Sequence, residues 1–138
     1  MHLLLRGFAV LATAGLLTGA SLGVVAAQQR TDSIEYQPDP DSATPRSFGV
    51  ANITYYTSTS PTRVLAEWHF WDLDDGHSYF IVLNGQGDGG TPFRGTCAFQ
   101  PLPGGEGTCT AHFSGMTSVV DSNVYQDGEG GPIALRMR

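Results

Sequence analysis

The sequence predicts an all-β fold, a single antiparallel β-sandwich of about seven strands that follows an N-terminal signal segment. Three observations lead to this prediction. Apolar and polar residues alternate with a period of two in several short segments, which is the pattern of half-buried strands. Gly, Pro, Asn and Asp separate these segments at fairly regular spacing, as turns do. No helical pattern is convincing after residue 27.

The first 27 residues predict a secretory signal peptide. Residues 8–27 carry no charge, and the small residues Val25-Ala26-Ala27 precede Gln28 as they would at a cleavage site. We therefore expect a secreted or cell-surface protein. The apolar run is long enough to span a bilayer, so residues 8–27 would be a membrane anchor if they were not cleaved.

The same segment supports an alternative. Arg6-Gly7-Phe8, followed by an apolar run, resembles the leader junction of type IV pilin-like proteins. That resemblance implies a structural surface subunit that retains residues 8–27. The chain departs from the family pattern, because Ala12 stands where the family carries an acidic residue.

Residues 28–47 are polar and contain three prolines, which predicts a flexible arm. A short edge strand over residues 33–36 is compatible with this arm. The β-sandwich domain itself is predicted over residues 48–138. Its expected strands are 50–57, 63–71, 77–84, 93–100, 107–114, one or two strands within 116–125, and 132–138.

The clearest strand spans residues 63–71, where apolar side chains fall at every second position and predict a core-facing row. These core-facing residues are Val64, Ala66, Trp68 and Phe70. We expect this strand to form a central hairpin with residues 77–84 across the Asp-rich turn at residues 72–76. A second hairpin is predicted from residues 93–100 and 107–114.

Val64-x-Ala66-x-Trp68, followed by Tyr79-x-Ile81-x-Leu83, is similar to the second and third strands of fibronectin type III and immunoglobulin-like domains. The resemblance covers about twenty residues and implies an immunoglobulin-like sandwich, without implying any active site. The antibody-type disulfide joins two sheets across a long stretch of sequence, whereas the two cysteines here are expected within one hairpin.

Charge restricts the classes of partner. The chain has seven basic residues, all of them Arg, against thirteen acidic residues, for a net charge of −6. Nucleic acids need a basic surface, so this balance argues against a nucleic-acid partner. With 41% hydrophobic and 14% charged residues, the composition is that of a folded globular domain.

Two residue types predict covalent modifications in an exported protein. Cys97 and Cys109 are an even pair and predict a disulfide. Asn52-Ile53-Thr54 is a glycosylation sequon, which makes Asn52 a candidate in a host that glycosylates exported chains.

Cys109, His112 and Met116 have a spacing that resembles the last ligand loop of cupredoxins, and His77 would supply the upstream imidazole. This resemblance implies a copper protein, a reading that competes with the predicted disulfide. Cys109 and His112 also point to opposite faces in the predicted strand.

Asp72, Asp74 and Asp75 form an acidic turn that is a candidate calcium site, although the turn lacks a full calcium-loop spacing. Asp is also an ordinary turn residue. No nucleophile elbow, phosphate-binding loop or zinc-protease motif occurs in the chain, so we expect a protein that is not an enzyme and has no cofactor.

The sequence thus predicts a secreted, non-enzymatic binding or adhesion module whose partner is an extracellular protein or a glycan. Tyr55, Tyr56 and Trp71 are the candidate binding-surface residues. The main alternative is an inhibitor of another enzyme, which would present the disulfide-tied loop at residues 100–107. The pilin-like subunit and the copper protein remain further alternatives.

Overall fold

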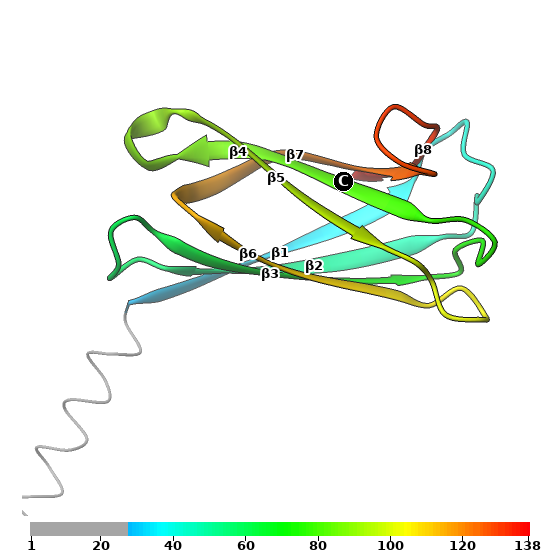
Figure 1. Ribbon diagram of the computed structural model, residues 1–138, viewed down its shortest axis with the longest axis horizontal. Helices are drawn as coiled ribbons and strands as arrows, with labels where there is room; N and C mark the ends of the chain where they lie inside the picture. The colour runs from blue at the N-terminus through cyan, green and yellow to red at the C-terminus, as the bar shows by residue number, and fades with distance from the viewer. Residues whose placement is uncertain (1–27) are drawn as a thin grey trace, which may run out of the picture.

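The computed structural model describes residues 28–138, so the predicted signal segment and its pilin-like alternative lie outside the described residues. The described chain forms eight strands, one short 3₁₀ turn and connecting loops (Figure 1). The strands are β1 (Gln29–Pro38), β2 (Phe48–Tyr56), β3 (Arg63–Trp71), β4 (Tyr79–Gly87), β5 (Pro92–Phe99), β6 (Gly107–Ser114), β7 (Met116–Gln126) and β8 (Ile133–Met137).

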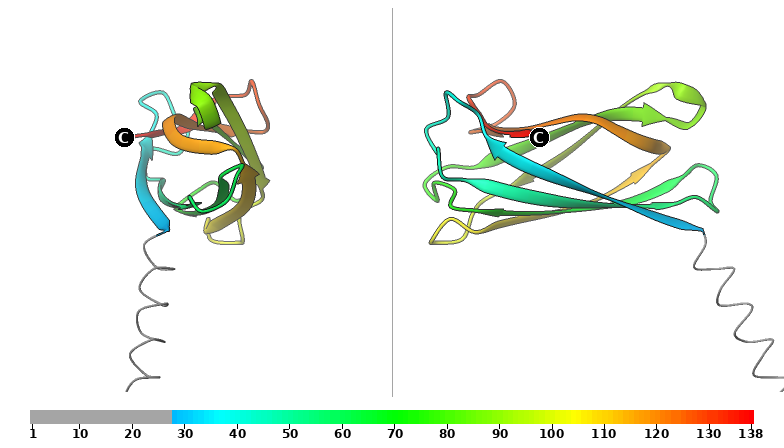
Figure 2. Two further views of the ribbon diagram at one scale, coloured as in Figure 1. Left: turned by 90° about the vertical axis from the view of Figure 1, so that its left-hand side faces the viewer. Right: turned by 180° about the vertical axis from the view of Figure 1, so that it is seen from behind.

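All eight strands belong to one antiparallel sheet with the order β5-β4-β7-β8-β1-β2-β3-β6. The sheet curls so that its two ends meet, and the end view in Figure 2 shows the strands around a ring. The prediction of an antiparallel all-β domain is confirmed. The prediction of two packed sheets is not, because the strands form one nearly closed barrel, and an immunoglobulin-like type is not confirmed.

The predicted flexible arm at residues 28–47 is wrong. Ten of these residues form β1, which pairs with β2 along almost its whole length and with β8 at its end. Ile34 and Tyr36 alternate with polar residues and enter the core, although the prolines that follow them suggested a linker. The connection to β2 is also fixed, since the buried Ser47 hydroxyl donates a hydrogen bond to the Thr44 carbonyl.

The two predicted hairpins are also wrong, because the strands of each do not form hydrogen bonds with one another. β3 pairs with β2 and β6, whereas β4 pairs with β5 and β7, so the turn at residues 72–76 crosses from one side of the barrel to the other. β5 and β6 follow one another in sequence but are the two edge strands of the sheet. Alternating sequence patterns identify strands without specifying their neighbours.

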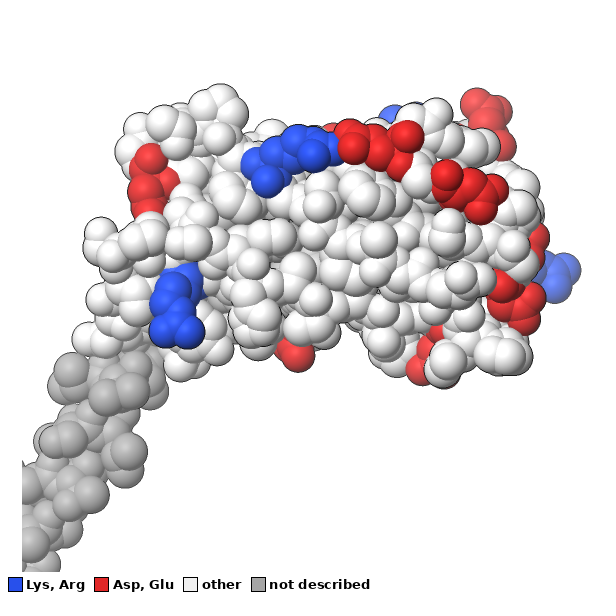
Figure 3. Space-filling model, viewed as in Figure 1, with Lys and Arg blue, Asp and Glu red and all other residues white. Residues whose placement is uncertain are grey.

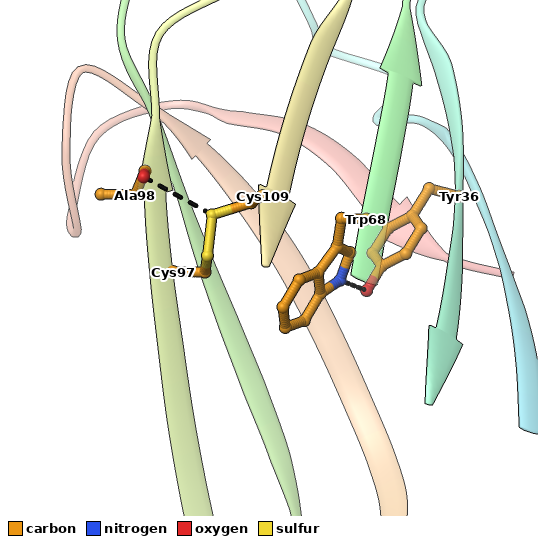
Figure 4. Close-up of a disulfide and its surroundings, with 5 residues drawn as sticks. All are labelled: Tyr36, Trp68, Cys97, Ala98 and Cys109. Atoms are coloured by element: carbon orange, nitrogen blue, oxygen red, sulfur yellow. Dashed lines mark hydrogen bonds between the residues drawn. A yellow bond between two sulfur atoms is a disulfide. The ribbon is translucent and has the colours of Figure 1, made fainter. Parts of the chain in front are cut away.

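Side chains close the seam between β5 and β6. The disulfide Cys97–Cys109 joins the two edges, which confirms the predicted pairing (Figure 4). The Phe113 ring of β6 covers Gly95 of β5, where an added Cβ would lie 2.7 Å from the ring. The two strands cross the front of Figure 1, and the centre of this face carries no charged side chains in Figure 3.

The opposite arrangement occurs near the other end of the seam, where the Phe99 ring of β5 covers Gly107 of β6. Phe99 also stacks on Phe70 of the core, with ring centroids 5.3 Å apart. Two aromatic rings and one disulfide therefore fill the seam from within, and this seals edges that would otherwise invite pairing with another chain.

A chain of buried hydrogen bonds crosses the interior of the barrel. Trp68 Nε1 donates to the Tyr36 hydroxyl at 2.9 Å, and Tyr36 donates to Ser122 Oγ at 2.7 Å. Ser122 in turn donates to the Val82 carbonyl at 3.0 Å, so the chain links β3, β1, β7 and β4. Figure 4 shows Trp68 and Tyr36 facing each other inside the barrel. Burial raises the pKa of Tyr36, which keeps its hydroxyl protonated and able to donate.

Candidate functional site

The outer face of β2, β3 and β6 presents a group of exposed polar and aromatic side chains. Inward residues of these strands fill the core, so the intervening residues point outward. The strand register places Asn52 of β2, Glu67 of β3 and Thr110 of β6 in one row across this face. We call the surface that these three strands share the β2–β3–β6 face.

An aromatic stack stands at one end of the β2–β3–β6 face. Phe48 and Trp71 are direct cross-strand neighbours, and their rings stack with centroids 5.0 Å apart. His69, two residues before Trp71 on the same side of β3, stacks on Trp71 with centroids 4.0 Å apart. Phe48 is nevertheless 47% exposed. A large apolar ring held in this way at the surface is available to a ligand.

Glu106 holds the last ring of the stack in place. Its Oε1 lies 2.6 Å from His69 Nε2, and both side chains remain accessible to solvent. The loop that carries Glu106 is itself anchored, because the Leu102 amide donates to the Glu106 carbonyl at 2.8 Å. The imidazole therefore has a defined orientation, and the stack is preorganised.

Two shallow hollows extend the surface along β3. One has a volume of about 300 Å³, includes the row at Asn52 and Glu67, and lies next to His69. The other has a volume of about 510 Å³ and lies between the loop after β2 and β6, with Arg63 and His112 in its wall. The β2–β3–β6 face thus offers carboxylate, amide, hydroxyl, imidazole and guanidinium groups beside an aromatic stack.

Only part of the predicted aromatic surface lies on this face. Tyr56 and Trp71 point outward, whereas Tyr55 is 1% exposed and points into the barrel. Its placement as a surface residue was wrong, because the β2 alternation starts from an inward Ala51. The Arg30 guanidinium lies 4.1 Å from the centre of the Tyr55 ring, and burial followed by the nearby Asp32 charge raises the Tyr55 pKa.

The structure does not bring the candidate copper ligands together. Cys109 is in the disulfide, Met116 is buried in the core, and His112 lies on the outer face of β6. His77 lies at the loops, where its Nδ1 is 2.7 Å from Asp127 Oδ2 and its Nε2 is 3.6 Å from Asp74 Oδ2. Within residues 28–138, no cluster of three or more His, Cys, Asp or Glu side chains has an arrangement that could hold a metal ion.

Two of the three candidate calcium ligands accept hydrogen bonds from backbone amides. Asp74 Oδ1 accepts from the Gly76 amide at 3.0 Å, and Asp75 Oδ2 accepts from the Gly104 amide at 3.0 Å. Asp72 has a φ of 56°, a conformation that Asp tolerates in turns. These contacts explain the Asp residues as turn-forming residues. The core residue Tyr79 is tied to this turn, because its hydroxyl donates to the Asp74 carbonyl at 3.0 Å. Burial raises the pKa of Tyr79 to about 12, so the hydroxyl stays protonated.

Two further candidates are exposed. Asn52 points outward from the middle of β2, so a glycan attached there would stand on the β2–β3–β6 face. In the loop at residues 100–107, Leu102 is 65% exposed while Pro101 and Gly105 are buried.

Sequence reasoning missed Phe48, His69 and Glu106. The Phe48–Trp71 contact depends on the β2–β3 register, and the His69–Glu106 contact depends on the pairing of β3 with β6, which joins residues 37 positions apart. The available signal was the alternation in β3, which already placed His69 and Trp71 on the same outer face.

Comparison with known proteins adds no assignment, because no family model, curated protein or solved structure matches the chain. Among residues 28–138, no helix has the length and apolar character needed to cross a membrane.

Proposed function

We propose that this protein is a secreted, non-enzymatic binding module and that the β2–β3–β6 face recognises a glycan. The observation that supports the proposal is the exposed stack of Phe48, Trp71 and His69 beside the polar row at Asn52 and Glu67. Sugar rings present an apolar C–H face and a rim of hydroxyl groups. Aromatic faces carry negative charge density and attract C–H groups, while carboxylates and amides bond hydroxyls.

The shape of the surface also favours an extended ligand. The two hollows lie on the same side of β3, and the second has Arg63 and His112 in its wall. Both hollows are open to solvent, whereas an enclosed pocket would bury most of a small molecule. A chain of sugar units can contact the aromatic stack and the polar row in succession.

The test is a binding screen of the native protein against immobilised and soluble polysaccharides, read by tryptophan fluorescence and by depletion from solution. Trp68 is buried and Trp71 lies on the outer face, so a ligand at the stack changes the Trp71 signal. Phe48→Ala and Trp71→Ala are expected to weaken binding at least tenfold. Val120→Ala is the matched control, because Val120 is 60% exposed on β7, away from this face.

Unchanged binding in the Phe48→Ala and Trp71→Ala variants, with both folded, would place the glycan elsewhere. A native protein that binds none of the polysaccharides in the screen would contradict the glycan assignment itself.

A second candidate function rests on Leu102. This exposed side chain is presented by a loop that the disulfide, the Leu102–Glu106 bond and the Asp75–Gly104 bond all hold in place. A rigid loop with an apolar tip suits an inhibitor of another enzyme. Leu102→Ala should abolish inhibition of such an enzyme and leave glycan binding unchanged, whereas Trp71→Ala should do the reverse.

A further inference from the structure

Arg63 lies at the end of the β2–β3–β6 face that is farthest from the aromatic stack. It is the first residue of β3 and Trp71 is the last, so the two are about 26 Å apart at the usual rise of a strand. Tyr56 of β2 and Ser114 of β6 are the direct neighbours of Arg63, and His112 of β6 is a diagonal neighbour. Long side chains in diagonal positions can reach the same ligand group.

The Arg63 guanidinium has no carboxylate partner among residues 28–138. Six arginines lie in this range, and four of them form ion pairs with carboxylates: Arg30, Arg94, Arg136 and Arg138. Asp88 meets the loop that precedes Arg63, but its carboxylate accepts hydrogen bonds from the Thr62 amide and hydroxyl at 3.1 and 2.9 Å. Arg63 is exposed, so its positive charge is available to a ligand.

The hollow beside Arg63 suits a sugar ring that carries an acidic group. Its volume is about 510 Å³. Tyr56 and Leu65 point outward into its lining and supply apolar surface for the C–H face of a sugar. Ser58 and Thr59 add hydroxyl groups to the lining, and Arg63 adds the positive charge.

Hydrogen bonds hold the wall of this hollow in place. The Thr59 hydroxyl donates to the Tyr56 carbonyl at 3.0 Å and accepts from the Arg63 amide at 3.0 Å, which ties the loop after β2 to the first residue of β3. The Gly115 amide donates to the Thr62 carbonyl at 2.7 Å and joins this loop to the end of β6. A site that is ordered before binding loses less conformational entropy when the ligand binds.

We propose that the glycan bound by the β2–β3–β6 face is acidic, and that Arg63 and His112 bind the carboxylate of a uronic acid unit. This inference rests on the proposed glycan function and names the class of glycan. The planar guanidinium presents two parallel N–H groups that match the two oxygens of a carboxylate. The His112 imidazole supplies a further N–H donor beside it.

The other charges of the face favour widely spaced carboxylates over a dense polyanion. Glu67 lies on the same side of β3 as Arg63, about 13 Å along the strand, and Glu106 lies at the aromatic stack. Like charges repel, and the whole chain carries a net charge of −6. A glycan that alternates uronic acids with neutral sugars can place a carboxylate at Arg63 and neutral units near both glutamates, whereas a densely sulfated chain cannot.

The test compares hyaluronan and gellan, two unsulfated polysaccharides that contain uronic acids, with the same polymers after reduction of their carboxyl groups to alcohols. Reduction removes the charge and keeps the sugar backbone. The native protein is expected to bind at least one acidic polymer about tenfold more tightly than its reduced form, measured by depletion from solution. Raising NaCl from about 0.05 M to about 0.5 M should remove most of that preference.

Arg63→Gln provides the matching change in the protein. It should reduce the preference for the acidic polymer from about tenfold to about twofold or less, and Arg63→Lys, which keeps the charge without the planar fork, should retain part of it. Arg138→Gln is the control with the same change in net charge. Arg138 pairs with Glu35 of β1, which is in register with His69, about 20 Å along β3 from Arg63. This control should keep the full preference.

Equal affinity of the native protein for the acidic and reduced polymers would overturn the acidic assignment and leave the glycan function standing. A preference that Arg63→Gln does not alter would overturn the role of Arg63. Tighter, Arg63-dependent binding of dextran sulfate, which carries sulfate and no carboxylate, would overturn the choice of a carboxylate. A native protein that binds no polysaccharide, acidic or neutral, would instead contradict the glycan function on which the inference rests.

Discussion

Tyr36→Phe tests whether the buried hydrogen-bond chain contributes to the stability of the barrel. The change removes one oxygen and keeps the ring, so it creates almost no cavity. It leaves Trp68 Nε1 without the acceptor that now lies 2.9 Å away, and it also removes the donor to Ser122. Trp68 is buried, so water does not readily replace the lost acceptor.

The expected cost is about 2 kcal/mol in the free energy of unfolding. A buried donor left without a partner costs about 1–3 kcal/mol, and Ser122 loses less because its hydroxyl still donates to the Val82 carbonyl. For a domain of this size, each kcal/mol lowers Tm by about 4 °C, so we expect a decrease of about 8 °C.

Urea unfolding followed by far-UV circular dichroism and by tryptophan fluorescence measures the cost. The urea dependence of the unfolding free energy should stay constant, since the variant exposes the same surface on unfolding. Tyr56→Phe is the control: Tyr56 is on the outer face, and its variant should stay within about 0.5 kcal/mol of the native protein.

If Tyr36→Phe lowers the free energy of unfolding by less than about 0.5 kcal/mol, the hydrogen-bond chain does not contribute as proposed. The Trp68 indole N–H would then have found another acceptor. A further check is the double variant with Ser122→Ala. Since both residues belong to one chain of bonds, the double variant should cost less than the sum of the two single changes.

Three other predictions follow from the seam and from one ion pair. Replacing Cys97 and Cys109 by Ala should cost about 3 kcal/mol in urea unfolding, as expected for a closed loop with a sequence separation of 12; a loss below about 1 kcal/mol would contradict this. Gly95→Ala should cost about 1–3 kcal/mol by the same assay, because its Cβ would lie 2.7 Å from the covering ring, and an unchanged stability would refute that packing. The hydrogen bond from Arg136 lowers the pKa of Asp39, so its stabilising effect is complete above the unfolded pKa of about 3.9 and is lost as pH falls through the folded pKa. Asp39→Asn should therefore flatten the decrease in stability below about pH 4, and an unaltered acid profile would argue against the pair.

Local pattern was sufficient to predict most strands and the disulfide. The alternation of Val64, Ala66, Trp68 and Phe70 specifies which side chains enter the core, and all four are buried. Neighbouring strands were not predictable in the same way, because sandwiches and barrels use the same alternation. The choice between them depends on long-range pairing, such as that of β1 with β8.

The candidate site was harder to predict because its residues come from separate parts of the chain. Phe48 meets Trp71 only after β2 and β3 pair in register, and Glu106 reaches His69 only after β6 pairs with β3. Tyr55 was wrongly placed on the surface. Tyr55 and Tyr56 are identical residues in adjacent positions, yet Tyr55 faces the core and Tyr56 faces solvent.

The filled interior determines where a ligand can bind. An eight-stranded barrel is just wide enough for side chains to fill it, and here Tyr36, Trp68 and Phe70 meet inside. Recognition must therefore use the outside of the barrel or a gap between strands. The β5–β6 seam leaves no such gap, because a disulfide and phenylalanine rings fill it.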